Sequence, residues 1–250
     1  MSDPQQLTIY QTFHKDYVRN ADCPWIQPVG VNGYLAEGFK SDGEGDDNIS
    51  SLNSFYCELT AQYWAWKNAT ADVVGFYHYR RYLNYVFDAT WQYQTTVGVP
   101  GDQFFLNYLT ADGQRSKLDE ILDVADAIVP KRAGSNRSIE AHYLAHHPAE
   151  TWEAFLEELH DQHPEYRRFI PLFKLNSTMS NCNMVVIRRE QFNAYCEELF
   201  PLIDAVYARI GAPYDTYNNR YPGFLAERFL GFWLHARGLR TFEVPLIQLT

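Results

Sequence analysis

The stretch Val73–Leu83, VVGFYHYRRYL, decides how the chain is built. It opens with β-branched, aromatic and apolar residues, which is typical of a strand buried inside a sheet. His78, Arg80 and Arg81 follow at the carboxyl end of that strand. Ligands of open α/β sheets bind beyond the carboxyl ends of the strands. The stretch therefore predicts a central strand over residues 73–79 and a basic cluster at the ligand-binding edge.

Strands and helices alternate along the rest of the chain. Runs of β-branched and aromatic residues predict strands over residues 7–13, 25–33, 127–130, 183–187 and 239–249. Apolar residues three or four apart predict helices over residues 54–69, 116–124, 139–163 with a break at Pro148, and 222–238, and a long helix after residue 187. Residues 84–116 give no clearer pattern than a short strand or a partial helix. The alternation predicts one α/β domain over residues 1–250.

The helix expected over residues 54–69 follows a polar, Gly- and Asp-rich loop over residues 36–53. Its apolar stripe is formed by Tyr56, Leu59, Tyr63 and Trp66. Ser51 and Asn53 precede that stripe and are candidate caps for the helix.

Composition and charge exclude several classes of partner. The chain has 31 acidic and 21 basic residues, a net charge of −10, which argues against general binding of nucleic acids or anionic membranes. Cys23, Cys57, Cys182 and Cys196 lack metal-motif spacing and are expected to be reduced thiols of a cytoplasmic protein. No signal peptide or membrane span is visible. We expect at most a peripheral contact with the inner face of the plasma membrane.

Motifs of common enzyme classes are missing from the sequence. It contains no G-x-x-x-x-G-K-[ST], no G-x-G-x-x-G and no G-x-S-x-G pattern. His142, His146 and His147 raise the alternative of a metal-dependent hydrolase. However, HYLAHH lacks the glutamate of H-E-x-x-H, so a solvated polar face is favoured there. The loop DGEGDDN over residues 42–48 does not match the calcium-loop spacing.

The basic cluster after residue 77 allows two interpretations. Guanidinium groups bind diphosphates well, because their planar fork makes paired, charge-assisted hydrogen bonds, and His78 would add a further donor. Alternatively, one of Arg80 and Arg81 points to solvent and the other forms an ion pair with a loop carboxylate. Composition alone leaves both interpretations open.

Four stretches in the same order resemble a known family. They are DDNISSLNSFYCELTAQYWAWKN, VVGFYHYRRYL, NCNMVVIRREQFNAYCEELFPLI and RYPGFLAERFLGFWL. Together they resemble the bacterial family named domain of unknown function DUF4422, over roughly residues 7–247. Members of that family look like glycosyltransferases of capsule, exopolysaccharide and O-antigen assembly. The resemblance implies a single GT-A-like, Rossmann-type domain with a mixed, mainly parallel central sheet flanked by helices.

The resemblance also implies a substrate and a way to bind it. Relatives suggest a UDP-hexose donor, such as UDP-galactose, and a glycan or lipid-linked glycan as acceptor. GT-A enzymes usually bind a divalent metal through an Asp-x-Asp motif after a central strand. Here the comparable place reads HYRRY, so we expect Arg80 and Arg81, with His78, to neutralise the diphosphate without a metal. The alternative is that Asp46 or Asp47, beside Asn48, supplies ligands for Mn²⁺ or Mg²⁺.

Further site residues follow from the same resemblance. SNCNMVV looks like the Phe-Asn-x-Gly region of retaining GT-A enzymes, which places Asn183 or Asn181 at the sugar. Thr12, His14 and Lys15 follow the first strand, where such enzymes contact uridine and ribose.

Two glutamates are candidates for deprotonating the acceptor hydroxyl. Glu227 is the first candidate, unless it only pairs with Arg228 or Arg220. Glu58 is the second candidate, unless it orients Arg80 or Arg81. The alternative from another functional class is a non-catalytic carbohydrate-binding module, which would use the 18 tyrosines to stack on sugars.

Overall fold

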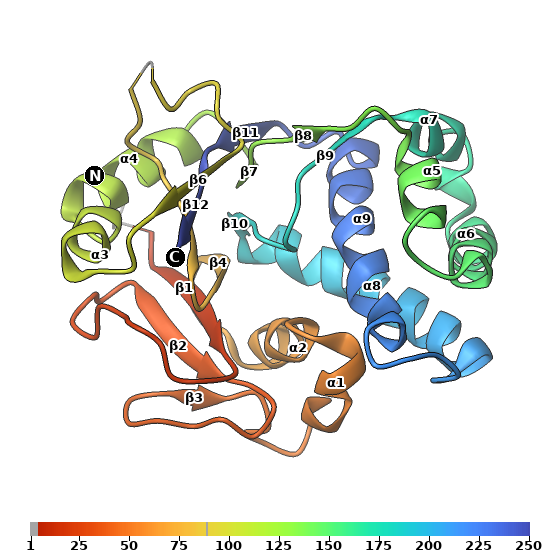
Figure 1. The fold of residues 1–250 in the computed structure, drawn as a ribbon, viewed down its shortest axis with the longest axis horizontal. Helices are drawn as coiled ribbons and strands as arrows, with labels where there is room; N and C mark the ends of the chain where they lie inside the picture. Colours follow the sequence, from red (N-terminus) through yellow and green to blue (C-terminus); the bar gives the residue numbers. More distant parts are fainter. Residues whose placement is uncertain (1–4, 89) are drawn as a thin grey trace.

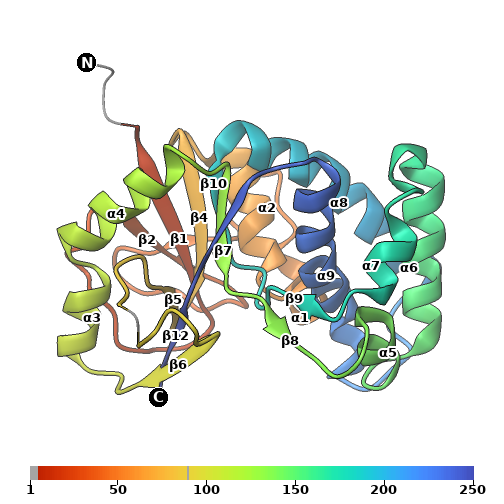
Figure 2. The ribbon, with the colours of Figure 1, turned by 90° about the horizontal axis from the view of Figure 1, so that it is seen from above.

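The structure, a computed structural model, describes residues 5–88 and 90–250 and is built around a ten-stranded sheet (Figures 1 and 2). Its strands are β1 (Leu7–Phe13), β2 (Ile26–Gly30), β3 (Lys40–Ser41), β4 (Val73–His78), β5 (Arg81–Leu83), β6 (Thr96–Val99), β7 (Ala127–Pro130), β10 (Val186–Arg188), β11 (Thr241–Val244) and β12 (Leu246–Leu249). The main order is β11-β7-β10-β4-β1-β2-β3, and β12 pairs with β5 and β6. A separate two-stranded ribbon joins β8 (Ala133–Gly134) to β9 (Thr178–Met179).

The sheet is mixed and mainly parallel, as expected. β4 pairs in parallel with β1, and β1 pairs in parallel with β2. β10 lies antiparallel between β4 and β7. Because β10 runs the other way, the loop that leads into it lies at the same edge of the sheet as the carboxyl ends of β1 and β4.

Helices cover both faces of the sheet. They are α1 (Asn53–Tyr56), α2 (Leu59–Asn68), α3 (Gln103–Leu109), α4 (Asp112–Leu122), α5 (Ile139–Leu144), α6 (Ala149–Gln162), α7 (Ile170–Leu175), α8 (Arg189–Ile210) and α9 (Tyr221–Ala236). Figure 2 shows α3 and α4 on one side of the sheet and α2, α8 and α9 on the other. Among the described residues, no helix combines the length and the apolar character needed to cross a bilayer.

The alternation of side chains along β4 explains why its sequence is apolar without interruption. Val73 and Tyr77 join the core under α3 and α4, whereas Val74 and Phe76 join the core under α2, α8 and α9. Both faces of the strand are therefore buried, which removes the usual alternation of polar and apolar residues. Gly75 has no side chain because a Cβ there would collide with Ile9 of β1.

The prediction of one continuous helix over residues 54–69 is wrong. The chain breaks at Cys57, whose φ is 53°, and α1 and α2 lie on either side of it. A non-glycine residue in this region costs about 1–3 kcal/mol and is commonly found at functional sites. The break also changes the stripe: Tyr63 and Trp66 are only half-buried, although Tyr56 and Leu59 are buried.

Neither predicted cap acts as one. Asn53 is the first residue of α1, and its side-chain amide donates to the carbonyl of Cys57 and to the hydroxyl of Thr60. It therefore stabilises the break and does not cap a helix. Ser51 lies within a short 3₁₀ turn, Ser50–Leu52.

Other elements differ from expectation in extent. The central strand ends at His78, residues 79–80 form a turn, and β5 follows as an antiparallel strand. The final strand is divided at Pro245 into β11 and β12. The stretch 84–116 holds β6, α3 and the start of α4. The break at Pro148 and the strands over 7–13 and 127–130 are confirmed.

Candidate active site

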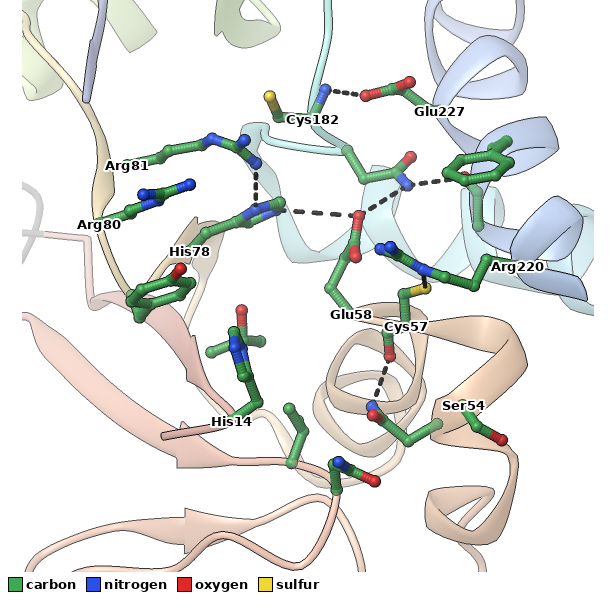
Figure 3. A pocket seen from close by; sticks show the side chains of 18 of the residues that line it. His14, Ser54, Cys57, Glu58, His78, Arg80, Arg81, Cys182, Arg220 and Glu227 are labelled. Atoms are coloured by element: carbon green, nitrogen blue, oxygen red, sulfur yellow. Dashed lines mark hydrogen bonds and ion pairs between the residues drawn. The ribbon is translucent and has the colours of Figure 1, made fainter. Parts of the chain in front are cut away.

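A cavity of about 610 Å³ opens at the carboxyl ends of β1 and β4 (Figure 3). Its walls come from the end of β1, the loop after β2, α1 with the break that follows it, the turn between β4 and β5, the loop before β10, and the start of α9 with the loop before it. The polar and charged side chains that line it are Thr12, His14, Asn32, Asn53, Ser54, Cys57, Glu58, His78, Tyr79, Arg80, Arg81, Cys182, Asn183, Thr216, Arg220 and Glu227. Six segments of the chain thus meet at one edge of the sheet.

Arg80 and Arg81 form the basic side of the cavity. Arg81 is held in place, because its Nε donates to Gln248 Oε1 (3.4 Å) and its Nη1 lies 3.1 Å from His78 Nδ1. The Nε of Arg80 is buried and has no hydrogen-bond partner among the described residues, and its guanidinium lies near the ring of Tyr79. Neither arginine lies within 4.0 Å of a carboxylate among residues 5–88 and 90–250. The alternative interpretation, an ion pair with a loop carboxylate, is therefore not found among the described residues.

Arg220 is a third arginine of the cavity, and it is not among the predicted site residues. It is the residue that precedes α9, and its Nε lies 3.0 Å from Cys57 Sγ. A cation at this position is unfavourable, because it lies beside the positive end of the α9 dipole. Within the described part of the chain it has no carboxylate within 4.0 Å. The sequence feature that could have marked Arg220 as a ligand-binding residue is its position directly before the proline-containing start of a helix.

Glu58 points into the middle of the cavity, between Arg81 and Arg220 (Figure 3). Its Oε1 accepts a hydrogen bond from Asn183 Nδ2 (3.1 Å) and lies 3.9 Å from His78 Nε2. Its alternative role was to orient Arg80 or Arg81, but its contacts are with His78 and Asn183.

His78 serves this site as a neutral group. Arginine can only donate, so Nδ1 of His78 accepts from Arg81 and the hydrogen lies on Nε2, facing Glu58. Burial lowers the pKa of His78, and the nearby Glu58 only partly opposes that shift. The positive charge of the cavity therefore comes from arginines.

Asn183 lines the cavity and has a buried side-chain oxygen without a hydrogen-bond partner among the described residues. Cys182 and Asn183 both have positive φ, 80° and 48°, which turns the chain sharply before β10. The Nδ2 of Asn183 donates to Glu58 and to the carbonyl of Gly223. Its Oδ1 is buried with no hydrogen-bond partner among the described residues. A buried acceptor of this kind is normally paired, so it is suited to a ligand hydroxyl.

Glu227 lies on the first turns of α9 with 22% of its side chain exposed. One carboxylate oxygen accepts from the backbone N–H of Cys182, and the other lies 3.4 Å from Arg228 Nη1. Its expected ion-pair partner is thus Arg228 and not Arg220. Burial raises the pKa of Glu227, although Arg228 acts in the opposite direction. A carboxylate with a raised pKa is a better proton acceptor near neutral pH.

The structure brings together eight of the predicted site residues: Thr12, His14, Glu58, His78, Arg80, Arg81, Asn183 and Glu227. The remaining five do not line the cavity: Lys15, Asn181, Asp46, Asp47 and Asn48. The Nζ of Lys15 lies over the ring of Tyr79, and Asn181 is exposed.

The loop that holds the last three faces away from the site. Asp47 accepts from the hydroxyl of Tyr63 (2.6 Å) and pairs with Lys67 (3.4 Å), and Asp46 is exposed. Asn48 donates to the carbonyl of Gly45 within its own loop.

The residues at the cavity do not fit the divalent metal typical of GT-A enzymes. Among the described residues that line it, the carboxylates are Glu58 and Glu227, and the three arginines accompany them. In the described ranges no group of three or more His, Cys, Asp and Glu side chains could hold a metal ion. This finding includes His142, His146 and His147, of which the His147 ring stacks on Phe224 (4.3 Å between centroids). This geometry does not support a metal-dependent hydrolase.

Comparisons with known proteins agree with this architecture. A solved structure of the bifunctional glycosyltransferase WbbM, in its apo form, superposes with a TM-score of 0.86 at 28% sequence identity. The match covers 98% of this chain and 45% of the WbbM chain, so this chain spans less than half of WbbM. No curated protein matches the chain. The family model described as "Domain of unknown function (DUF4422)" matches residues 8–238, and the chain therefore belongs to the DUF4422 family.

Proposed function

We propose that the chain is a glycosyltransferase that moves a hexose, such as galactose, from a UDP-sugar to a surface-glycan acceptor. The observation that carries this proposal is the set of three arginines around one cavity, Arg80, Arg81 and Arg220, with no carboxylate partner within the described residues. Cations left unpaired in a chain of net charge −10 are best explained by an anionic ligand. The similarity to WbbM supports sugar transfer as the reaction.

The arginines are placed to stabilise the leaving group. As the bond between the anomeric carbon and the β-phosphate oxygen breaks, its electrons leave with UDP and the diphosphate gains negative charge. Preorganised guanidinium groups stabilise that charge without having to reorient. In this proposal Arg80 and Arg81 bind the diphosphate from one side and Arg220 from the other.

The remaining groups have complementary roles in the proposed reaction. Glu227 accepts the proton of the acceptor hydroxyl while the hydroxyl oxygen bonds to the anomeric carbon. The free Oδ1 of Asn183 accepts a hydrogen bond from a sugar hydroxyl, and Glu58 positions Asn183 and His78. Thr12 and His14, at the end of β1, are placed for the nucleoside.

Calorimetry with UDP, UDP-galactose and uridine tests the donor proposal. We expect UDP to bind far more tightly than uridine, in EDTA as well as in Mn²⁺, because protein cations supply the charge. Absence of UDP binding in both buffers would exclude the donor. Binding that requires Mn²⁺ would instead indicate that a metal ion binds the diphosphate. Saturation by a glycan without any affinity for UDP would favour the carbohydrate-binding module.

Turnover tests the proposed base. Glu227→Gln keeps the shape of the side chain but removes the proton acceptor, so transfer should fall by about 10²–10⁴-fold while UDP affinity is retained. A Glu227→Gln protein with the full transfer rate would move the role of base to another residue.

A further inference from the structure

The break between α1 and α2 turns two neighbouring side chains toward the cavity. Cys57 and Glu58 both line it, and Figure 3 shows Cys57 beside Arg220. The backbone of Cys57 has a φ of 53° and a ψ of −131°, a conformation that glycine adopts freely and that is strained for other residues. The chain nevertheless carries a cysteine there, so the thiol needs a reason beyond the course of the backbone.

Hydrogen bonds fix the break and, with it, the position of the thiol. The side-chain amide of Asn53 donates to the carbonyl of Cys57 and to the hydroxyl of Thr60, both at 2.8 Å. The Thr60 hydroxyl donates in turn to the carboxylate of Asp42 (2.6 Å), and both of these residues are buried. These bonds are internal to the protein, so the sulfur is in place before a substrate binds.

The sulfur of Cys57 holds Arg220 through one nitrogen of its guanidinium. The Nε of Arg220 donates to Cys57 Sγ at 3.0 Å, and the guanidinium carbon lies 5.6 Å from the centroid of the Phe224 ring. Its two Nη groups make no hydrogen bond with any of the residues 5–88 and 90–250. A guanidinium fixed through Nε thus keeps both Nη groups for paired hydrogen bonds with an anion.

A thiol can hold an arginine without neutralising it. Burial raises the pKa of Cys57 to about 11, so the sulfur is uncharged near neutral pH. Elsewhere in the chain carboxylates pair with arginines, as Asp126 does with Arg240 (3.0 Å). A carboxylate beside Arg220 would compensate its charge and weaken its attraction for an anion. The uncharged acceptor leaves the positive charge of Arg220 to the cavity.

We infer that Cys57 is a positioning residue, whose thiol holds the charged guanidinium of Arg220 in place for the diphosphate of the UDP-sugar. This inference rests on the proposed donor. Cys57 touches no reacting atom and acts only through Arg220. Arginine has several rotatable bonds, and fixing them in advance removes an entropic cost that binding would otherwise carry. The strained backbone at Cys57 thus serves ligand binding and not the stability of the fold.

Calorimetry with UDP and uridine on three variants tests this role. Cys57→Ala removes the acceptor and should raise the Kd for UDP by about tenfold, the lower end of what a hydrogen bond to a charged group contributes. Cys57→Gly also removes the strain and should lose the same affinity, because Arg220 contacts the thiol and not the backbone. Cys57→Ser keeps an acceptor and should stay within about threefold of wild type. Uridine affinity should be unchanged in all three variants, since uridine carries no phosphate.

A double-mutant cycle determines whether Cys57 acts through Arg220. Arg220→Ala should itself weaken UDP binding, and in that background Cys57→Ala should cause no further loss. Cys23→Ala is the matched control and should keep wild-type affinity, because Cys23 is a buried thiol that does not line the cavity. Thermal melting checks that each variant is folded. Cys57→Gly keeps the test valid if Cys57→Ala melts early, because glycine adopts this backbone without strain.

The outcomes separate this inference from the donor proposal. If UDP binds and Arg220→Ala weakens its binding, but Cys57→Ala and Cys57→Gly keep wild-type affinity, the positioning role is overturned and the donor proposal stands. Losses from Cys57→Ala and Arg220→Ala that simply add, or an equal loss for UDP and uridine, would overturn it as well. If the wild-type protein does not bind UDP at all, the donor proposal fails, and the role of Cys57 fails with it.

Discussion

Replacing Arg80 by alanine should weaken UDP binding without weakening the fold. Arg80 makes no side-chain hydrogen bond or ion pair with another described residue, and its Nε is buried and unpartnered. Its one described side-chain interaction is a cation–π contact, in which the guanidinium carbon lies 5.5 Å from the centroid of the Tyr79 ring. Removing the guanidinium therefore breaks little in the free protein. The free energy of unfolding should change by no more than about 0.5 kcal/mol.

The expected loss of affinity follows from the kind of bond removed. A hydrogen bond to a charged group contributes about 1.5–3 kcal/mol. Each 1.4 kcal/mol is tenfold in affinity, so Arg80→Ala should raise the Kd for UDP by about 10–150-fold. Arg80→Lys keeps the charge but loses the planar fork, so its effect should be smaller. Arg81→Ala should lose both affinity and some stability, because Arg81 also contacts His78 and Gln248.

Calorimetry with UDP and with uridine separates the diphosphate from the nucleoside. Arg80→Ala should reduce UDP affinity and leave uridine affinity unchanged, since uridine carries no phosphate. Arg137→Ala is the matched control, because Arg137 is an exposed arginine outside the cavity. Wild-type affinity for UDP in Arg80→Ala, or an equal loss for UDP and uridine, would refute the reasoning.

Three further changes test other parts of the structure. Burial lowers the pKa of His147 to about 4, so stability is full above pH 6.5 and should fall by about 1–2 kcal/mol as the pH drops toward 4, because solvent screening reduces the effect at this half-buried ring. His147→Phe should remove this dependence of the unfolding free energy on pH, as measured by urea titrations at several pH values. An unchanged pH dependence would contradict the assignment to His147. Gly30→Ala should destabilise the fold by about 1–3 kcal/mol, because its Cβ would collide with the carbonyl oxygen of Tyr34, whereas Gly113→Ala should not, and equal melting temperatures would argue against this clash. Asn183→Ala should weaken UDP-hexose binding about tenfold by losing a sugar hydrogen bond but leave UDP binding unchanged; a loss shared by both ligands would reassign Asn183.

The sheet could be predicted because its strands carry strong local signals. The strands over 7–13 and 127–130 match the structure residue for residue, and the start of β4 was placed correctly. Each is rich in β-branched, aromatic or aliphatic residues and is almost wholly buried, and no helical periodicity competes with it. The same logic placed His78, Arg80 and Arg81 at the edge of the sheet where the carboxyl ends of β1 and β4 lie.

The break at Cys57 could not be predicted, because it depends on distant partners. The stripe of aromatic residues continues through it, so local periodicity indicates a continuous helix. Asn53 and Arg220 hold the break from either side, and Arg220 lies 163 residues from Cys57. Arg220 itself was missed as a ligand, because no strand end or motif marks it. Only its unfavourable position before a helix distinguishes it from a surface arginine.

The pairing of β5 with β12 has a consequence for how the protein is made. Gln248 fixes Arg81 from a position 167 residues further along the chain. The ribosome therefore releases β1, β2 and β4 long before β12 emerges, and until then β5, which begins at Arg81, pairs with β4 but not yet with β12. Closing so long a loop is slow compared with forming local contacts. A nascent chain arrested before β12 should be largely folded and yet unable to retain a nucleotide.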